Sequence, residues 1–298
     1  MFNNEQGTGR MVFPDFQAVY GFLMYSSLFL ALIAGAMIYM SCVIQDLPLV
    51  PSAFGIMALM TYSVYNLNRK TDEKEDAINH SERYAFTKKY ERFLFASALL
   101  TYLIAFFLAG IHGAAVLAIT AIPLVSGIVY SMPVFPRQFG FRRLKEIPII
   151  KSLIVATAWA IPAALLPAYV LSAAPGISTV IIGLFIFSLA FVNTVVFDMR
   201  DVAGDIVSGV RTIPVLLGVA RTKILLTLVN LLFGTIAVLF GLAVLSFAEI
   251  CILIVAIAYV QWYIVYFQQI AVTGVLCDLI VDGQFIVFGG LVYAATNF

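Results

Sequence analysis

Residues 152–197 read SLIVATAWAIPAALLPAYVLSAAPGISTVIIGLFIFSLAFVNTVVF and contain no Asp, Glu, Lys or Arg. This run is too long for one membrane-spanning helix, which needs about 20 apolar residues. Ala174-Pro175-Gly176 interrupts it near the middle, and such a tripeptide is typical of a turn. The stretch therefore predicts two membrane-spanning helices, near residues 150–170 and 178–197, joined by a short loop.

The rest of the chain has the same apolar character. Of its 298 residues, 62% are hydrophobic and 11% are charged, whereas soluble domains have about 45–50% apolar and about 25% charged residues. This composition excludes a soluble globular protein, a disordered chain and a secreted disulfide scaffold. It predicts one intramembrane domain over residues 1–298, an all-α bundle of nine membrane-spanning helices. The nine charge-poor runs lie near residues 19–44, 48–67, 93–110, 114–132, 150–170, 178–197, 223–243, 249–269 and 279–297.

The basic residues predict how this bundle is oriented. All 17 Lys and Arg residues lie in the N-terminal tail or in three segments, residues 69–92, 137–151 and 200–223. These segments follow the second, fourth and sixth predicted spans. By the positive-inside rule, they and the N-terminus are cytoplasmic, and a ninth span leaves the C-terminus outside. The net charge of +1 gives no reason to expect a nucleic-acid partner.

Two of the cytoplasmic segments carry polar side chains at helical spacing. They are Asn68, Asp72 and Asp76 after the second span, and Asp198, Asp201 and Asp205 after the sixth. If each segment is helical, its three side chains share one face. Like charges on one face repel and need compensation. Mg²⁺ provides it, because this ion prefers oxygen ligands and usually binds through a few carboxylates plus substrate phosphates. The two faces therefore suggest Mg²⁺ holding a diphosphate between them. A solvated loop with acids paired to nearby basic residues is the alternative.

At this point the motifs resemble those of the UbiA superfamily of intramembrane prenyltransferases. The pattern N-x-x-x-D-x-x-x-D over residues 68–76 and the pattern D-x-x-D-x-x-x-D over residues 198–205 are similar to the two Asp-rich motifs of that family. Residues 204–214, GDIVSGVRTIP, resemble its G-D-x-x-x-G-x-[RK]-T-x-P continuation. The Tyr130-Ser131-x-Pro133 segment and the basic residues 142–145 resemble its motif after the fourth span. The likeness covers nearly the whole chain.

The resemblance implies helices around a central cavity that opens to the cytoplasmic side and to lipid. It implies Mg²⁺-dependent transfer of an isoprenyl group from a prenyl diphosphate to a lipophilic or aromatic acceptor, in quinone or lipid biosynthesis. Carried over by position, the metal and diphosphate ligands are Asn68, Asp72, Asp76, Asp201 and Asp205, with Asp198 joining them on the same face. Tyr130 matches the tyrosine of the family motif, and Lys145 matches its basic residue.

The chemistry also follows from the residues themselves. An allylic diphosphate ionises when preorganised positive charge neutralises its leaving group. Basic residues at the same boundary are candidates for the phosphate oxygens, namely Lys145, Arg143, Lys151, Arg137 and Arg211. The resulting carbocation needs a dry chamber lined by aromatic rings, and Tyr130 is the candidate here. An interfacial role for Tyr130 and a purely topological role for the basic residues remain open.

Two other functions are compatible with acids in a membrane protein. A CDP-alcohol phosphotransferase also joins D-x-x-x-D to Mg²⁺, but its upstream D-G-x-x-A-R run is missing before Asp201. A cation-coupled transporter uses intramembrane acids, although such sites tend to lie near the midplane. The acceptor, the prenyl chain length and the oligomeric state stay open. Asp278 and Asp282 have no basic residue near them in the sequence, and both functional and capping roles are possible for them.

Overall fold

A computed structural model describes residues 14–71, 73–132, 136 and 143–297 of the chain. Within these residues the structure is helical and contains no strand. Its elements in chain order are α1 (Pro14–Tyr25), α2 (Leu28–Ile44), α3 (Pro51–Thr71), α4 (Glu73–Asn79), α5 (Ser81–Lys89), α6 (Glu91–Ile111), α7 (Ala114–Ser131), the 3₁₀-helix η2 (Leu144–Glu146), α8 (Pro148–Val170), α9 (Ile177–Ser208), α10 (Ile213–Leu217), α11 (Val219–Gly241), α12 (Phe247–Val265), α13 (Phe267–Ile270), α14 (Gly274–Val281) and α15 (Gln284–Asn297).

Seven helices of the described chain are long and apolar enough to cross a membrane, and the bent pair α1–α2 makes an eighth candidate. They correspond to eight of the nine predicted spans, and the protein is an integral, multi-pass membrane protein. The predicted count of nine is not confirmed. The second predicted span is the 21-residue helix α3. This helix is long enough to cross a membrane, but it is not among the candidates because it is less apolar. Its last turns carry Asn66, Asn68, Arg69 and Lys70, which lower its hydropathy.

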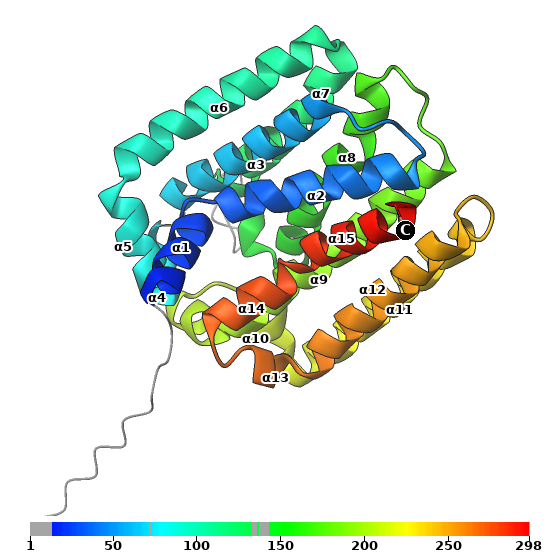
Figure 1. Cartoon of the computed structure of the whole chain (residues 1–298). Coiled ribbons are helices and arrows are strands. Elements are labelled where there is room, and N and C mark those ends of the chain that lie inside the picture. The colour runs from blue at the N-terminus through cyan, green and yellow to red at the C-terminus, as the bar shows by residue number, and fades with distance from the viewer. Residues whose placement is uncertain (1–13, 72, 133–135, 137–142, 298) are drawn as a thin grey trace, which may run out of the picture.

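The helix α9 is the most buried of the candidate spans. It has 32 residues. In its most apolar stretch of 18 residues, 67% of the residues are buried, whereas the corresponding share is 22–44% in the other six spans. Contacts between neighbouring helices close a ring that includes α9 and runs through α2, α3, α7, α8, α9, α11, α12 and α15 and back to α2. Figure 1 shows α6 at one edge of the bundle and the α11–α12 pair at the other. The helix α9 ends at Gly209, whose φ of 73° is a left-handed conformation that glycine adopts readily.

The first predicted span, residues 19–44, is broken. The axes of α1 and α2 differ by 68°, and Ser27 at the break has a φ of 67°. Two side chains of α3 hold the carbonyl groups that the break exposes: Arg69 Nη2 donates to Met24 O and Asn66 Nδ2 donates to Ser26 O, each at 3.0 Å. The break therefore depends on contacts made by α3 and not on a local proline or glycine.

The short helices gather at one end of the bundle, where α3 and α9 also end. Figure 1 shows α4, α5, α10 and α13 together at this end, beside α1 and α14. Among them, α4 packs against α9 and α5 packs against α1. This arrangement brings the segment after the second predicted span against the segment that ends the sixth.

The last predicted span is also interrupted, at Asp282-Gly283 between α14 and α15. A methyl group on Gly283 would overlap the carbonyl oxygen of Leu279. Because that oxygen belongs to the backbone, it cannot move aside as a flexible side chain would. The close approach at this break therefore requires glycine.

We expect Gly283→Ala to lower the thermal stability of the purified protein in detergent, because such overpacking costs about 1–3 kcal/mol. Gly290→Ala is the matched control on α15, since its added methyl would meet no atom within 4 Å. Thermal unfolding of both variants, followed by circular dichroism, tests the expectation. Equal stability of the two variants would contradict the requirement for glycine at residue 283.

Candidate functional site

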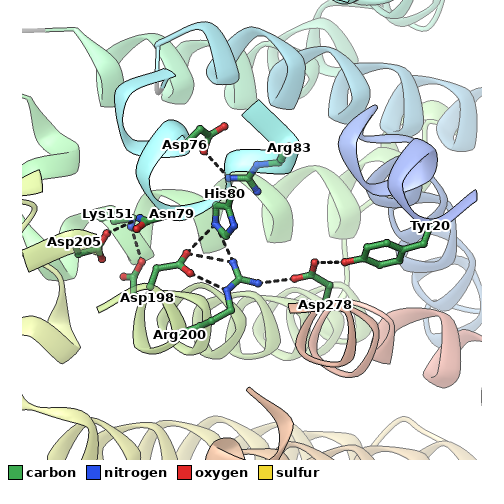
Figure 2. Close-up of polar contacts among 11 residues, drawn as sticks. Tyr20, Asp76, Asn79, His80, Arg83, Lys151, Asp198, Arg200, Asp205 and Asp278 are labelled. Carbon is green, nitrogen blue, oxygen red and sulfur yellow. Dashed lines mark hydrogen bonds and ion pairs between the residues drawn. The ribbon is translucent and has the colours of Figure 1, made fainter. Parts of the chain in front are cut away.

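The three acids of the second Asp-rich motif lie on one continuous helix. Asp198, Asp201 and Asp205 all belong to α9, which continues past the predicted end of its span at residue 197 as far as Ser208. Asp198 and Asp205 are buried, and Asp201 is half-buried. Figure 2 shows Asp198 and Asp205 with the polar side chains around them.

Asp198 pairs with Lys151 from α8. Lys151 Nζ donates to Asp198 Oδ1 at 2.5 Å, and the aspartate side chain is only 6% exposed. The other oxygen, Oδ2, is buried and has no hydrogen-bond partner among the described residues. A buried carboxylate oxygen without a partner is costly. The pair therefore leaves one strong acceptor available at the inner side of the site.

Asp201 lies in a network that connects four helical segments. Arg200 Nε and Nη2 donate to its carboxylate at 2.8 and 3.2 Å, and His80 Nε2 lies 3.2 Å from Asp201 Oδ2. Arg200 Nη1 also donates to Asp278 of α14 at 2.6 Å, and Tyr20 of α1 donates to the same carboxylate at 2.7 Å. Asp278, which has no basic neighbour in the sequence, is thus paired through the fold (Figure 2).

The first Asp-rich motif reaches the site through α4. Asp76 is buried and accepts a hydrogen bond from Arg83 Nη2 at 2.5 Å. Three residues after Asp76, Asn79 Nδ2 donates to Asp205 Oδ1 at 3.3 Å. The two acidic segments are therefore in contact, with Asn79 and His80 on one side and the last turns of α9 on the other (Figure 2).

The expected single helical face of the first motif stays a prediction, because the described residues do not include the position that joins its two halves. Asn68 belongs to α3, which ends at Thr71, whereas Asp76 belongs to α4, which begins at Glu73. Asn68 lies against α7, where a methyl group on Gly127 would come within 3.2 Å of Asn68 Oδ1. Asp72, between the two helices, lies outside the described residues.

The other predicted site residues fall in different places. Lys151 is at the acids, and Tyr130 of α7 is within electrostatic reach of it. Arg143 donates to Glu146 at 2.7 Å, and Arg211 is exposed between α9 and α10. The side chain of Lys145 and all of Arg137 lie outside the described residues.

Several site residues were not expected as functional residues from the sequence. They are Asn79, His80, Arg83, Arg200 and Tyr20. His80 has no neighbour at metal-ligand spacing in the sequence, and Arg83 lies seven residues from its partner Asp76. The acid-rich context after the second span was the one available signal, since α4 follows directly from it.

A second charged cluster lies on the outer side of α3, where α5 and α6 begin to pack. Lys88 contacts Glu73 and Glu91, each at 3.1 Å, and Lys70 lies 3.5 Å from Glu91. Hydrogen bonds to Glu73 and Glu91 raise the pKa of the exposed Lys88 ammonium group above its ordinary value. These acids balance their own basic neighbours, and their exposure makes the pairs weak contributors to stability.

In the described part of the chain, no three His, Cys, Asp or Glu side chains come together as a group that could hold a metal ion. The described carboxylates of the two motifs instead contact Lys151, Arg200, His80, Arg83 and Asn79. The arrangement is a set of buried acids, held by the protein's own polar groups, at one end of a helical membrane bundle. It defines a membrane protein with a charged site at one end of its helical bundle.

The comparisons identify the family. The UbiA prenyltransferase family model matches residues 27–273, and the chain belongs to this family of prenyl-transferring membrane enzymes. A search of the curated proteins found no match.

Solved structures share the fold over nearly the whole chain. A UbiA homologue from Archaeoglobus fulgidus bound to GPP and Mg²⁺ superposes with a TM-score of 0.64 at 16% identity, covering 92% of this chain and 99% of that one. A structure described for digeranylgeranylglyceryl phosphate synthase gives a TM-score of 0.59 at 14% identity, covering 95% and 97%. The apo structure of a UbiA homologue from Aeropyrum pernix K1 gives a TM-score of 0.58 at 16% identity, covering 89% of this chain and 98% of that one.

Proposed function

We propose that this protein transfers an isoprenyl group from an allylic prenyl diphosphate to a lipophilic or aromatic acceptor, in a Mg²⁺-dependent reaction of quinone or lipid biosynthesis. The observation that carries the proposal is the contact between the two acidic segments, α4 and the end of α9. The A. fulgidus relative bound to GPP and Mg²⁺ supports it.

The residues of the site fit a divalent cation. Hard cations take carboxylate and amide oxygens, and Asp198 has a buried Oδ2 without a partner among the described residues. Asp76, Asp201 and Asp205 bring further carboxylates to the same end of the bundle. When bound, Mg²⁺ supplies neutralising charge for the diphosphate leaving group. Its proposed ligands are Asn68, Asp72, Asp76, Asp198, Asp201 and Asp205.

The basic residues then serve the diphosphate. Lys151 is already at the acids and bonds Asp198, so we assign it to the phosphate oxygens when the metal takes over part of its role. Arg143, Lys145 and Arg211 are proposed as additional contacts. Tyr130, which is within electrostatic reach of Lys151, is proposed to face the allylic carbon, because an aromatic ring attracts a developing cation.

We infer that this end of the bundle faces the cytoplasm. Basic residues flank the site on α5, η2 and α8, and after α9, whereas the loops at the opposite end carry none. This distribution follows the positive-inside rule. It gives a cytoplasmic N-terminus and a site that a water-soluble diphosphate reaches from the cytoplasm.

Product formation by the purified protein in lipid tests the function. Labelled geranyl and geranylgeranyl diphosphates are offered with a panel of acceptors, with Mg²⁺ or with EDTA. A labelled product that needs Mg²⁺ is expected, and its mass identifies the acceptor. Absence of product with every acceptor, together with absence of Mg²⁺-dependent donor binding, would contradict the proposal and favour a transporter.

Metal removal has its own expected result. Geranyl diphosphate with Mg²⁺ should raise the melting temperature of the wild-type protein, because a ligand that binds only the folded state stabilises it by mass action. Geranyl diphosphate with EDTA should leave the melting temperature unchanged, because the acids then repel the diphosphate. Equal stabilisation in both conditions would contradict a metal-dependent donor site.

A further inference from the structure

A polar cluster that the donor site does not use lies deeper in the bundle, at the break in the last span. It consists of Asn193 of α9, Tyr263 of α12, and Asp282 and Gln284 on either side of Gly283. Asn193, Tyr263 and Gln284 are buried, and Asp282 is half-buried. An ionisable side chain inside a membrane span is costly and usually has a function. Asp282 lies within the span Gly274–Asn297.

The hydrogen bonds of this cluster centre on Asn193. Its Nδ2 donates to Val281 O at 3.0 Å and to Asp282 Oδ1 at 3.3 Å. Its Oδ1 accepts from Tyr263 at 3.2 Å and from Gln284 Nε2 at 2.5 Å. The side-chain amide of Asn193 therefore uses both its donors and accepts two hydrogen bonds at its oxygen. It fixes the positions of Asp282 and Gln284.

The groups that remain open are acceptors. Gln284 Oε1 is buried and has no hydrogen-bond partner in the described part of the chain. Asp282 receives a hydrogen bond at Oδ1, and no described residue donates to its Oδ2. The tyrosine hydroxyl and the asparagine amide have already used their donors. A ligand that satisfies the cluster must therefore bring its own donor, as a hydroxyl group does.

The depth of the cluster suits the acceptor of prenyl transfer. Arg200 and Asn193 are seven residues apart on α9, which is about 10 Å along the helix axis. The Arg200–Asp278 pair lies at the end of the bundle that carries the acids, and the Asn193–Asp282 pair lies further from that end. The reacting carbon of the donor is bonded directly to the diphosphate. The acceptor must therefore approach that carbon from the membrane side of the charged site.

Aromatic side chains adjoin the same region. Asp282 is within electrostatic reach of the Tyr65 hydroxyl of α3, and Trp159 Nε1 of α8 donates to that hydroxyl at 2.9 Å. The two rings lie 5.8 Å apart between centroids. Asp282 therefore lies near an aromatic part of the bundle interior.

We propose, on the basis of the function above, that Asp282 and Gln284 form the acceptor site and accept a hydrogen bond from a hydroxyl group of the acceptor. The cluster selects a hydroxyl group over a carboxylate at this point, because Asp282 repels a second negative charge. Asn193 and Tyr263 act through these two residues and position them.

Binding measurements on the full-length protein in lipid nanodiscs test the site with simple hydroxyl compounds in place of the acceptor. The protein is first loaded with Mg²⁺ and a non-hydrolysable thio analogue of geranyl diphosphate. Hydroquinone and a long-chain glyceryl ether then serve as an aromatic and an aliphatic hydroxyl probe, and their fully O-methylated forms serve as controls without a donor. The test variant is Asp282→Asn. The matched control is Asp46→Asn, because Asp46 is exposed and follows the C-terminal end of α2.

We expect at least one hydroxyl probe to bind the wild-type and Asp46→Asn proteins, and its methylated form to bind neither. Asp282→Asn should weaken that probe about 10- to 100-fold, as expected for loss of a hydrogen bond to a charged group, with the affinity for the donor analogue unchanged. Equal probe binding to Asp282→Asn and wild type, or equal binding of the methylated probe, would overturn the proposal. So would binding of the donor analogue without binding of either hydroxyl probe, or parallel loss of donor binding in Asp282→Asn.

Failure of the proposed function looks different. If the wild-type protein does not bind the donor analogue with Mg²⁺, the donor site itself is wrong. The acceptor site is overturned with it, because the site rests on that function. If the donor analogue binds and only the probes fail, the donor site stands and the assignment of Asp282 falls alone.

Discussion

Asp201→Asn is expected to reduce prenyl transfer by at least about 10²-fold, the scale of losing one preorganised electrostatic contact in an active site. Asp201 lies between Arg200 and His80 on the face of α9 that meets α4. The substitution keeps the shape of the side chain and removes its charge, so Mg²⁺ loses a proposed ligand. Turnover of labelled geranyl diphosphate and Mg²⁺-dependent binding of the donor should fall together.

Glu73→Gln is the matched control for this experiment. Glu73 lies on α4, close to the first motif, but its carboxylate is partly exposed and pairs with Lys88. Loss of such an exposed pair changes stability by about 1 kcal/mol or less, and turnover should stay near the wild-type value. Full activity in Asp201→Asn would remove the second motif from the proposed metal site.

Lys151→Met is expected to destabilise the protein by about 3–5 kcal/mol, because it leaves the buried charge of Asp198 without its partner. The Asp198 side chain is 6% exposed, and Lys151 is the residue that compensates one of its oxygens. The change should appear as a large fall in melting temperature in the absence of ligands. Mg²⁺ with geranyl diphosphate should raise the melting temperature of this variant more than that of the wild type, since the metal supplies the missing positive charge.

The double variant Lys151→Met/Asp198→Asn separates charge from packing. Removing both charges should recover most of the lost stability, because a neutral pair no longer carries an uncompensated ion. It should not recover activity, since a proposed metal ligand and a proposed phosphate contact are both gone. A melting temperature of Lys151→Met equal to that of the wild type would show that Asp198 does not depend on Lys151.

Much of the fold could be predicted from the sequence, because the membrane imposes one simple rule on apolar segments. The charge-free run over residues 152–197 became α8 and α9, with the turn at Ala174-Pro175-Gly176 between them. The break near Ser27 could not be predicted in this way. It contains neither proline nor glycine, and the donors that hold it, Asn66 and Arg69, come from α3.

The site was less predictable than the bundle. Spacing placed Asp198, Asp201 and Asp205 on one helix, and they lie on α9. Spacing could not give the partners, because Lys151 is 47 residues from Asp198 and Arg200 is 78 residues from Asp278. Long-range pairing depends on how helices cross, and local periodicity carries no information about that.

The length of α9 ties the chemistry to the lipid around it. Its 32 residues extend about 48 Å, whereas the hydrocarbon core of a bilayer is about 30 Å thick. The helix is therefore longer than the hydrocarbon core by about three turns, and its acidic end occupies the excess. Membranes differ in thickness by a few ångströms, and a spanning helix adjusts by tilting or by shifting its ends. A thicker bilayer consequently draws the acids toward the hydrocarbon boundary, and a thinner one lifts them further into the aqueous phase.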